Sequence, residues 1–376
     1  MKKFIIIPDS FKETMSAQEI CRIVGKAISR YYPQAEIRSI PVADGGEGSV
    51  DSFLAAMDGQ KVFVDVKGPF MEKIKAYYGI TADGTAVIET AACAGFPMVK
   101  GRSVGEASTY GVGQLIVHAA AHGCGKIIVG LGGSCTNDGG AGAAAAAGVK
   151  FYDGAGKSFL PIGETLDKIA GIDISGFCPE VRMAKIISIC DTDIPLYGPS
   201  GAARMFGPQK GADPAMVEKL DRGLKNLAEK VRKSLGRDVS ELPGSGAAGG
   251  MGGGMAAFFG SKLQSGIETM LSCVHFDELA KDADLIISGE GKIDSQSLRG
   301  KVVSGVARHA KKLGIPLVAI VGDIGDDIAG LYDSGVSAVF STNRVAASFD
   351  EARKRCREDL ALTADNLFRF LKILKI

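Results

Sequence analysis

Short apolar runs alternate with amphipathic segments at the start of the chain. Residues 4–7 are all apolar, and the sequence SAQE at 16–19 is a capping box that begins an amphipathic stretch to about Tyr32. A second strand is predicted at 37–42, followed by a glycine-rich turn and a helix to about Met57. This repeated order of strand, turn and helix predicts the beginning of a parallel α/β sheet.

The pattern changes after the second helix. Three segments rich in β-forming residues follow one another at 62–66, 74–80 and 86–89, joined by short polar turns and without an intervening helix. Such spacing is typical of an antiparallel meander. We therefore expect a domain boundary near residue 62.

Longer elements return in the middle of the chain. A second capping box at 103–106 predicts a helix to His122, and an apolar run at 126–131 predicts a buried strand. The remaining predictions here are an alanine-rich helix at 139–147, a strand at 186–190, a helix at 214–235 and a glycine-rich tract at 244–254.

Regular alternation resumes near residue 280. Strands are predicted at 284–288, 316–321 and 338–341, with helices at 302–313 and 349–373. Together with the two early strands they make five, the number of a flavodoxin-like sheet. We therefore predict an α/β protein in which residues 1–62 and 276–376 form a discontinuous flavodoxin-like domain with a parallel five-stranded sheet. A second α/β domain, residues 63–275, is inserted into it. Two consecutive domains are the alternative, but the early strands would then lack partners.

Composition and charge narrow the classes of function. The chain has 44 basic and 43 acidic residues, a balance that leaves no electrostatic footprint for nucleic acid or an anionic membrane. No apolar stretch is long enough to span a bilayer, and the first apolar run ends at Pro8, too early for a signal peptide. The eight cysteines show no zinc-ligand spacing and indicate a reducing compartment. We expect a cytoplasmic protein that acts on small molecules.

Candidate chemistry is densest at 289–301, with the sequence GEGKIDSQSLRGK between a predicted strand and a helix. Open α/β sheets bind ligands at this edge, and amides at a helix start with a nearby lysine suit a phosphate. The segment is not a complete Walker A motif, and a long polar connector is the simpler alternative. Mixed charge on glycine hinges favours the functional interpretation. The residues of interest are Gly289, Gly291, Lys292, Asp294, Gly300 and Lys301.

Two other turns follow the early strands. The sequences DSFK at 9–12 and DGGEG at 44–48 belong to the same predicted sheet edge. If the five-strand topology holds, Asp9, Asp44 and Asp294 converge there. Carboxylates beside lysines suit a magnesium–nucleotide complex, whereas each aspartate alone could be a helix cap.

Two glycine tracts in the middle of the chain are further candidates. The turn at 132–140 offers backbone amides and hydroxyls for a phosphate from Gly132, Gly133, Ser134 and Thr136, with a tight turn capped by Asp138 as the alternative. The tract at 244–249 matches GxGxxG but follows a proline and a polar stretch, so it lacks the context of a dinucleotide fingerprint. We interpret its Gly246 and Gly249 as a loop that covers a nucleotide.

An apolar strand also precedes Asp191-Thr192-Asp193. This pattern is similar to that of aspartyl-phosphate phosphatases, but Pro195 occupies the position where they need Thr or Val. Asp191 is therefore a candidate base or metal ligand. Lys210, in the loop GPQKG, offers another cation, and a solvated turn is the alternative there.

Taken together and in order, these motifs resemble the type-1 glycerate kinase family over nearly the whole chain. They are PDSFK at 8–12, ADGGEG at 43–48, GGS at 132–134, TNDGG at 136–140, Cys190-Asp191, FGPQKG at 206–211, GAAGG at 246–250, and GEG at 289–291 with Asp294, Gln296, Gly300 and Lys301. The resemblance implies phosphorylation of D-glycerate by ATP with Mg²⁺, with the 2-position favoured over the 3-position. Two departures are Asp193 where the family commonly has asparagine, and Glu13-Thr14 where it often has Gly-Ser.

A mechanism follows from the chemistry of a small hydroxy acid. Lys12, with Lys292 or Lys301, is expected to neutralise the carboxylate and phosphoryl oxygens, and closure of two domains is the expected motion. Asp191 or Asp294 is expected to accept the hydroxyl proton. Further assignments are substrate contacts from Ser10, Lys12, Gln296 and Lys210, and magnesium ligands Asp9 and Asp44.

Two other functions compete with the kinase. One is a phosphatase with Asp191 as nucleophile, and the other is a non-catalytic nucleotide-binding regulator. The many acidic residues at the predicted sheet edge favour metal-assisted chemistry over the regulator. The sequence leaves both a monomer and a homodimer open.

Overall fold

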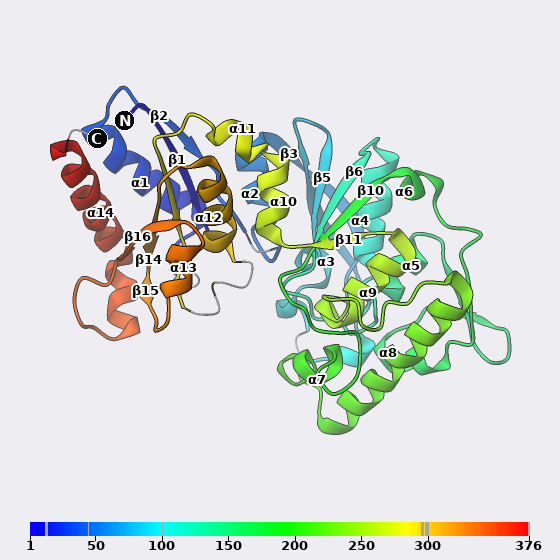
Figure 1. The fold of residues 1–376 in the computed structure, drawn as a ribbon. Helices are drawn as coiled ribbons and strands as arrows, with labels where there is room; N and C mark the ends of the chain where they lie inside the picture. Colours follow the sequence, from blue (N-terminus) through cyan, green and yellow to red (C-terminus); the bar gives the residue numbers. More distant parts are fainter. Residues whose placement is uncertain (12–13, 44, 100, 295–296, 298–300, 375–376) are drawn as a thin grey trace. The chain divides into compact units, whose positions relative to one another are not determined.

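The computed structural model describes residues 1–11, 14–43, 45–99, 101–294, 297 and 301–374, and it divides into two compact units (Figure 1). Unit 1 comprises Met1–Asp44, Asp51–Asp58 and Ser265–Ile376, and unit 2 comprises Gly45–Val50 and Gly59–Gln264. Both ends of the chain therefore belong to one unit and its middle forms most of the other. The short segment Gly45–Val50, which the sequence pattern puts with the early strands, groups with unit 2.

Unit 1 contains a five-stranded sheet in which every neighbouring pair is parallel. Its spatial order, β16-β14-β12-β1-β2, is the flavodoxin-like order, and the predicted fold class is confirmed. The middle strands are continuous apolar runs because both of their faces are covered. The strands are β1 (Lys3–Pro8), β2 (Glu36–Ser39), β12 (Leu285–Gly289), β14 (Leu317–Val321) and β16 (Val336–Ser341).

Helices cover both faces of this sheet (Figure 1). On one face, α1 (Ala17–Tyr31) packs against α14 (Phe349–Ile373), and their apolar sides meet β1 in one core. The predicted capping box is present, since the Ser16 side chain accepts a hydrogen bond from the Glu19 amide. The other helices of this unit are α10 (Gly266–Cys273), α11 (Phe276–Ala280), α12 (Val302–Leu313) and α13 (Ala329–Asp333), and α2 (Ser49–Met57) crosses the division between the units.

Unit 2 is built on a mixed six-stranded sheet of order β11-β10-β6-β5-β4-β3. The first three strands along the chain form the predicted antiparallel meander, and β5, β6, β10 and β11 run parallel to one another. The strands are β3 (Gly59–Lys67), β4 (Lys73–Thr81), β5 (Thr85–Glu89), β6 (Lys126–Gly130), β10 (Lys185–Ile189) and β11 (Lys262–Gln264).

One helix of unit 2 begins later than its sequence predicts. The capping box at 103–106 produces only a 3₁₀ turn, Val104–Glu106, and α4 runs over Tyr110–Ala121. The delay has a physical cause, because the Thr109 amide and hydroxyl donate to the buried Asp138 carboxylate. The remaining helices are α3 (Ala91–Ala94), α5 (Ala141–Ala146), α6 (Pro179–Met183), α7 (Ala202–Phe206), α8 (Pro214–Leu235) and α9 (Ala247–Phe259).

Two small sheets complete the fold. Strands β7 (Lys150–Tyr152), β8 (Ser158–Phe159) and β9 (Gly171–Asp173) form an antiparallel sheet in unit 2. In unit 1, β13 (Lys292–Ile293) pairs in parallel with β15 (Asp323–Ile324). This second pair extends the main sheet beyond its carboxyl edge and determines how the segment after β12 is held.

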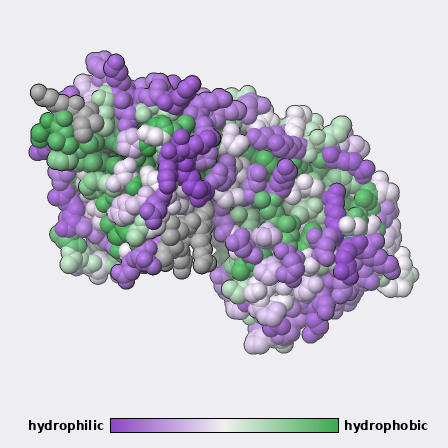
Figure 2. Space-filling view, viewed as in Figure 1, coloured by the Kyte–Doolittle hydropathy of each residue, from purple (hydrophilic) through white to green (hydrophobic). Residues whose placement is uncertain are grey.

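A hydrophobic area lies on the surface of unit 1 at its last helix. Figure 2 shows it over the C-terminal end of α14, where Phe370, Ile373 and Leu374 are exposed. Elsewhere on the visible face, hydrophilic and hydrophobic side chains are interspersed. Within the described ranges of the chain, no helix combines the length and apolar character that crossing a bilayer requires.

Candidate functional site

The carboxyl ends of β1 and β12 lie side by side in unit 1. Pro8 is in register with Gly289, and the Asp9 amide donates to the Gly289 carbonyl at 2.8 Å. The Asp9 carboxylate accepts a hydrogen bond from the Ser10 amide at 2.7 Å. The predicted metal ligand Asp9 and substrate residue Ser10 therefore lie beside the start of the glycine-rich segment.

The first half of that segment is an ordered extension of the sheet. The Gly322 amide donates to the Glu290 carbonyl at 3.2 Å, and the Asp323 amide donates to the Gly291 carbonyl at 3.0 Å. The Gly325 amide then donates to Ile293 at 2.8 Å. The strand that follows β14 thus holds residues 289–294 in place.

Acids and lysines alternate along this segment and pair with each other. Lys292 lies 3.9 Å from Asp294, and Lys301 lies 3.9 Å from Glu290, measured between nitrogen and carboxylate oxygen. Lys292 and Lys301 keep much of their side chains exposed. Both cations therefore stand beside carboxylates at the sheet edge and remain accessible from solvent.

Glu290 is a residue that the sequence analysis did not single out. Its side chain is buried, and its Oε1 atom has no hydrogen-bond partner among the residues described. Burial raises the pKa of Glu290, while Ser297 and Lys301 act in the opposite direction. A buried oxygen without a partner marks a position where a water, cation or ligand donor is needed. Its only sequence signal was its place between two glycines directly after a buried strand.

Four predicted site residues, Lys12, Asp44, Gln296 and Gly300, lie outside the described residues. Of the three aspartates that we expected to converge, only Asp9 and Asp294 are among the described residues. Asp9 directly follows β1, whereas Asp294 follows β13, the short strand that comes after the β1 neighbour β12 in the chain. Gly45, which follows Asp44 in the sequence, accepts a hydrogen bond from the Gly132 amide at 3.0 Å in unit 2.

In unit 2 the turn after β6 is closed by hydrogen bonds of its own. The Ser134 hydroxyl contacts the Thr136 hydroxyl at 2.9 Å and accepts from the Thr136 amide at 3.1 Å. The Cys135 amide donates to the Ala94 carbonyl. The two hydroxyls predicted to bind phosphate are therefore together on one short, ordered turn.

Asp138 anchors the other end of this turn. Its fully buried carboxylate accepts from the Thr109 amide and hydroxyl and from the amides of Gly140 and Gly142. Burial raises the pKa of Asp138 and these four donors oppose the effect. The helix-cap role that the sequence suggested for Asp138 is thus combined with a link to the start of α4.

Lys210 is buried and does not lie in a solvated turn. Only 6% of the residue is exposed, and its Nζ atom donates to the Thr136 carbonyl at 2.7 Å. Burial lowers the pKa of Lys210 to about 8. The ammonium group therefore supports the Ser134–Thr136 turn from within.

The tract at 244–250 packs against the same turn. Ala248, Gly249 and Gly250 have successive left-handed conformations at the start of α9. The Gly139 amide donates to Gly249, and a Cβ atom on Gly249 would lie 2.0 Å from the Thr136 carbonyl. The tract leads into a helix without a preceding strand, in agreement with its interpretation as a glycine loop other than a dinucleotide fingerprint.

Asp191 lies at the same edge of the unit 2 sheet as the Gly132 turn. Strand β10 ends at Ile189 in register with Gly130, and the Leu131 amide donates to the Ile189 carbonyl at 3.2 Å. Asp191 is exposed, whereas burial raises the pKa of the preceding Cys190 to about 11. The edge therefore presents an accessible carboxylate beside an inert thiol.

Asn137 was also missed from the sequence. The residue is fully buried, and neither its Oδ1 nor its Nδ2 atom has a hydrogen-bond partner in the part of the chain that is described. Ser245 Oγ, in the other glycine tract, is buried without a partner in the same sense. The described residues contain no group of three or more His, Cys, Asp or Glu arranged to hold a metal ion.

Each unit thus presents glycine turns, lysines and carboxylates at the carboxyl edge of parallel strands. Amides in tight turns and lysines suit phosphate groups, and carboxylates suit proton transfer or a hard cation. These features define an α/β protein of the phosphate-handling class.

Comparison with known proteins makes the assignment specific. A family model described as the glycerate kinase family matches residues 4–372. "Glycerate 2-kinase" of Escherichia coli (strain K12) is 42% identical over 374 residues, 99% of this chain and 98% of that protein. "Glycerate kinase" of Halalkalibacterium halodurans is 42% identical over 98% of this chain and 97% of its own.

A solved structure agrees. A crystal structure from Salmonella typhimurium LT2, provisionally named glycerate kinase 2, superposes with a TM-score of 0.89 at 40% identity and covers 100% of this chain and 99% of its own. The chain belongs to the glycerate kinase family and is an enzyme of the phosphotransferase class, as its motifs predicted.

Proposed function

We propose that this enzyme transfers the γ-phosphoryl group of ATP to a hydroxyl of D-glycerate, preferentially at the 2-position. The observation that carries the proposal is the full-length family match, in which the E. coli relative is named a 2-kinase. The site chemistry supports it, because Lys292, Lys301 and the hydroxyls of Ser134 and Thr136 are suited to anionic oxygens.

The proposed reaction requires one proton acceptor. The glycerate oxygen forms a bond to phosphorus, the bond from phosphorus to ADP breaks, and the hydroxyl proton passes to a carboxylate. We assign this role to Asp191 or Asp294 because both follow strands at a carboxyl edge. Lys12, Lys292 and Lys301 are assigned to the developing negative charge, and Ser10 and Gln296 to the substrate.

Lys210 acts indirectly in this scheme. Its Nζ atom already donates to the Thr136 carbonyl and is buried, so it supports the turn that carries the hydroxyls of Ser134 and Thr136. The phosphate-binding assignments therefore include Gly132, Gly133, Ser134 and Thr136 from the turn, Gly246 and Gly249 from the tract packed on it, and Gly289, Gly291 and Gly300 from unit 1.

A magnesium ion fits the donor chemistry at the end of β1. Asp9 supplies a carboxylate there, and the buried Glu290 after the neighbouring strand has an oxygen without a partner in the described part of the chain. We propose that Asp9 and Asp44 hold Mg²⁺. When bound, the ion supplies charge neutralisation for the phosphate oxygens of ATP.

Product analysis tests the proposal directly. The purified protein is incubated with ATP, MgCl₂ and D-glycerate, and the product is identified by phosphorus NMR. We expect 2-phosphoglycerate, formed in step with ADP and absent when EDTA is added. If the product is 3-phosphoglycerate, the proposed position of transfer is wrong. If ATP remains intact, the proposed kinase activity is wrong.

A second reaction mixture addresses the phosphatase alternative. It contains 2-phosphoglycerate and magnesium but no nucleotide, and released inorganic phosphate is measured. We expect no release above that from heat-denatured protein. Release that is abolished in Asp191→Asn would favour the phosphatase with Asp191 as nucleophile.

A further inference from the structure

A pocket in unit 2 lies at the edge of the sheet opposite to the Gly132 turn. It has a volume of about 560 Å³, within the range of small-molecule sites. The pocket is located where β10 and β11 begin and where α8 and α9 end, as its lining residues Lys185, Lys262, Leu235 and Phe259 show. It is therefore separate from every residue assigned above to phosphoryl transfer.

The described residues that line this pocket carry only positive charge. Arg182, Lys185, Arg237 and Lys262 are among them, and no described aspartate or glutamate is. Among the residues described, none of these four cations forms an ion pair. Arg182 donates only to the Ile174 carbonyl at 3.4 Å, and Arg237 donates to the Ala257 carbonyl at 2.6 Å and to Ala256 at 3.4 Å.

The acidic residue next to Arg237 in the sequence does not neutralise this charge. The Asp238 carboxylate accepts from the Ser240 amide and hydroxyl and lies 3.9 Å from Arg232. Four like charges around one cavity repel each other, and an anion bound among them relieves that repulsion. The charge pattern thus favours an anionic ligand.

Three phenylalanines also line the pocket. Phe177 and Phe259 meet edge to face with ring centroids 5.6 Å apart, and Phe258, next to Phe259 in the sequence, is largely buried. The Arg182 guanidinium lies 5.8 Å from the Phe177 centroid. Aromatic rings offer an apolar, planar ligand both dispersion contacts and a defined stacking geometry.

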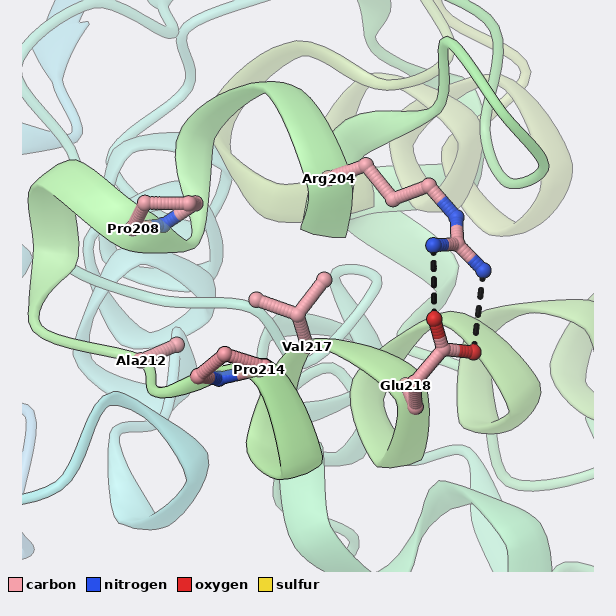
Figure 3. A pocket seen from close by; sticks show the side chains of 6 residues that line it. All are labelled: Arg204, Pro208, Ala212, Pro214, Val217 and Glu218. Atoms are coloured by element: carbon pink, nitrogen blue, oxygen red, sulfur yellow. Dashed lines mark hydrogen bonds and ion pairs between the residues drawn. The ribbon is translucent and has the colours of Figure 1, made fainter.

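A different pocket of unit 2, at the beginning of α8, contains a cation that is paired with a carboxylate. Figure 3 shows the groove of about 350 Å³ between α7 and α8, lined by Pro208, Pro214 and Val217. Its Arg204 faces Glu218 and forms two hydrogen bonds of 2.6 and 2.9 Å with that carboxylate. The charge of Arg204 is therefore neutralised by Glu218. The four cations around β10 and β11 have no such carboxylate partner among the described residues.

We propose that the pocket at the start of β10 and β11 binds a small organic anion with a planar apolar body. The anionic group of the ligand lies among the four lining cations, and its apolar body lies against the three lining phenylalanines. The proposal concerns a site distinct from the proposed phosphoryl-transfer chemistry and does not depend on it.

Calorimetry with naphthalene-2-sulfonate tests the proposal on the full chain, with naphthalene-2-sulfonamide as the uncharged probe of similar shape. We expect one sulfonate per chain, unaffected by saturating ATP and magnesium, and at least tenfold weaker binding of the sulfonamide. The double variant Lys185→Gln/Lys262→Gln should weaken sulfonate binding at least fivefold. The control Lys157→Gln/Lys225→Gln removes the same charge from exposed lysines of unit 2 and should leave binding unchanged.

Several results would overturn the proposal. They are no binding to the wild-type protein, equal affinity for the two probes, equal losses in the two double variants, or displacement of the sulfonate by ATP. Arg182→Gln provides an independent variant, and it should also weaken binding at least threefold. Circular dichroism and thermal unfolding establish that each variant is folded before its affinity is compared.

Discussion

The buried ammonium group of Lys210 shows how one residue links two parts of the candidate site. Its hydrogen bond to Thr136 supports a turn 74 residues earlier in the chain. Burial of a charge is costly unless the group is paired or loses its proton, and here the pKa of Lys210 falls to about 8. The residue therefore changes protonation state within an experimentally accessible pH range.

We predict that this titration appears in the stability of the protein. Between about pH 8 and the ordinary lysine pKa of 10.5, the unfolded chain holds a proton that the folded chain has lost. Unfolding then takes up a proton, so the free energy of unfolding rises with pH, by on the order of 3 kcal/mol over the window.

Urea unfolding of the wild-type protein and Lys210→Met at intervals from pH 7 to pH 10.5 checks this. The rise should be absent in Lys210→Met and present in Lys225→Met, which removes an exposed lysine of the same unit. Parallel pH profiles for the wild-type protein and Lys210→Met would show that Lys210 keeps its proton when folded.

The identity of the base can be tested by charge removal. We expect Asp191→Asn or Asp294→Asn to lower kcat by about 100-fold or more, because an amide cannot accept the hydroxyl proton. Asp193→Asn is the matched control, since Asp193 is exposed and lies two residues beyond Asp191. If a variant turns over at the wild-type rate, the substituted residue is not the proton acceptor. Steady-state kinetics with varied glycerate also separates effects on kcat from effects on KM.

At the scale of elements, two glycine-rich segments form one interlocked structure in unit 2. The turn that follows β6 and the tract that begins α9 approach so closely that a side chain cannot fit at Gly249. Lys210 supports the same turn, and Asp138, at the end of the turn, accepts hydrogen bonds from Thr109. The distant segments around Thr109, Lys210 and Gly249 thus determine the shape of one turn, which explains why glycines are concentrated here.

We predict unequal effects of alanine at two glycines with the same φ of +67°. Gly236→Ala, in open space at the end of α8, should cost about 1 kcal/mol, the strain of a left-handed alanine. Gly249→Ala adds a clash with the Thr136 carbonyl and should cost about 3 kcal/mol or more.

The two variants are compared by urea unfolding and by kcat/KM. We expect only Gly249→Ala to lose activity, because it displaces the turn that carries Ser134 and Thr136. Equal losses of stability and activity in the two variants would mean that the close approach at Gly249 has no consequence.

For the whole molecule, the decisive feature is that both chain ends build the same sheet. Ile7 and Ser288, 281 residues apart, are hydrogen-bonded in adjacent strands. Closing a loop of that length in an unfolded chain costs about 5 kcal/mol of conformational entropy. Folding of unit 2 first brings the ends of the intervening chain together and lowers that cost.

We therefore predict an order of folding. In pulse-labelling hydrogen exchange during refolding, amides of β6 and β10 should gain protection before those of β1. The antiparallel pair β3 and β4 provides a local reference that should be protected early. Protection of β1 before β6 would show that unit 1 assembles independently of the inserted segment.

The five strands of the flavodoxin-like sheet could be predicted from the sequence. Apolar runs such as 4–7 predict buried strands, because a strand that is covered on both faces does not alternate apolar and polar residues. The turns after β6 and β12 could also be predicted, since clustered glycines at strand ends are typical of tight turns. The family resemblance rested on these same turns and was confirmed.

Which polar residues are buried depends on the folded structure and could not be predicted from the sequence. Nothing local to Asn137, Glu290 or Lys210 distinguishes them from solvated loop residues, and their burial comes from segments far away in sequence. The late start of α4 has the same origin, because Asp138 lies 29 residues beyond Thr109. The cationic pocket likewise joins residues spread from 182 to 262. Local periodicity determines elements, whereas burial and charge neutralisation depend on contacts that form only when the chain is folded.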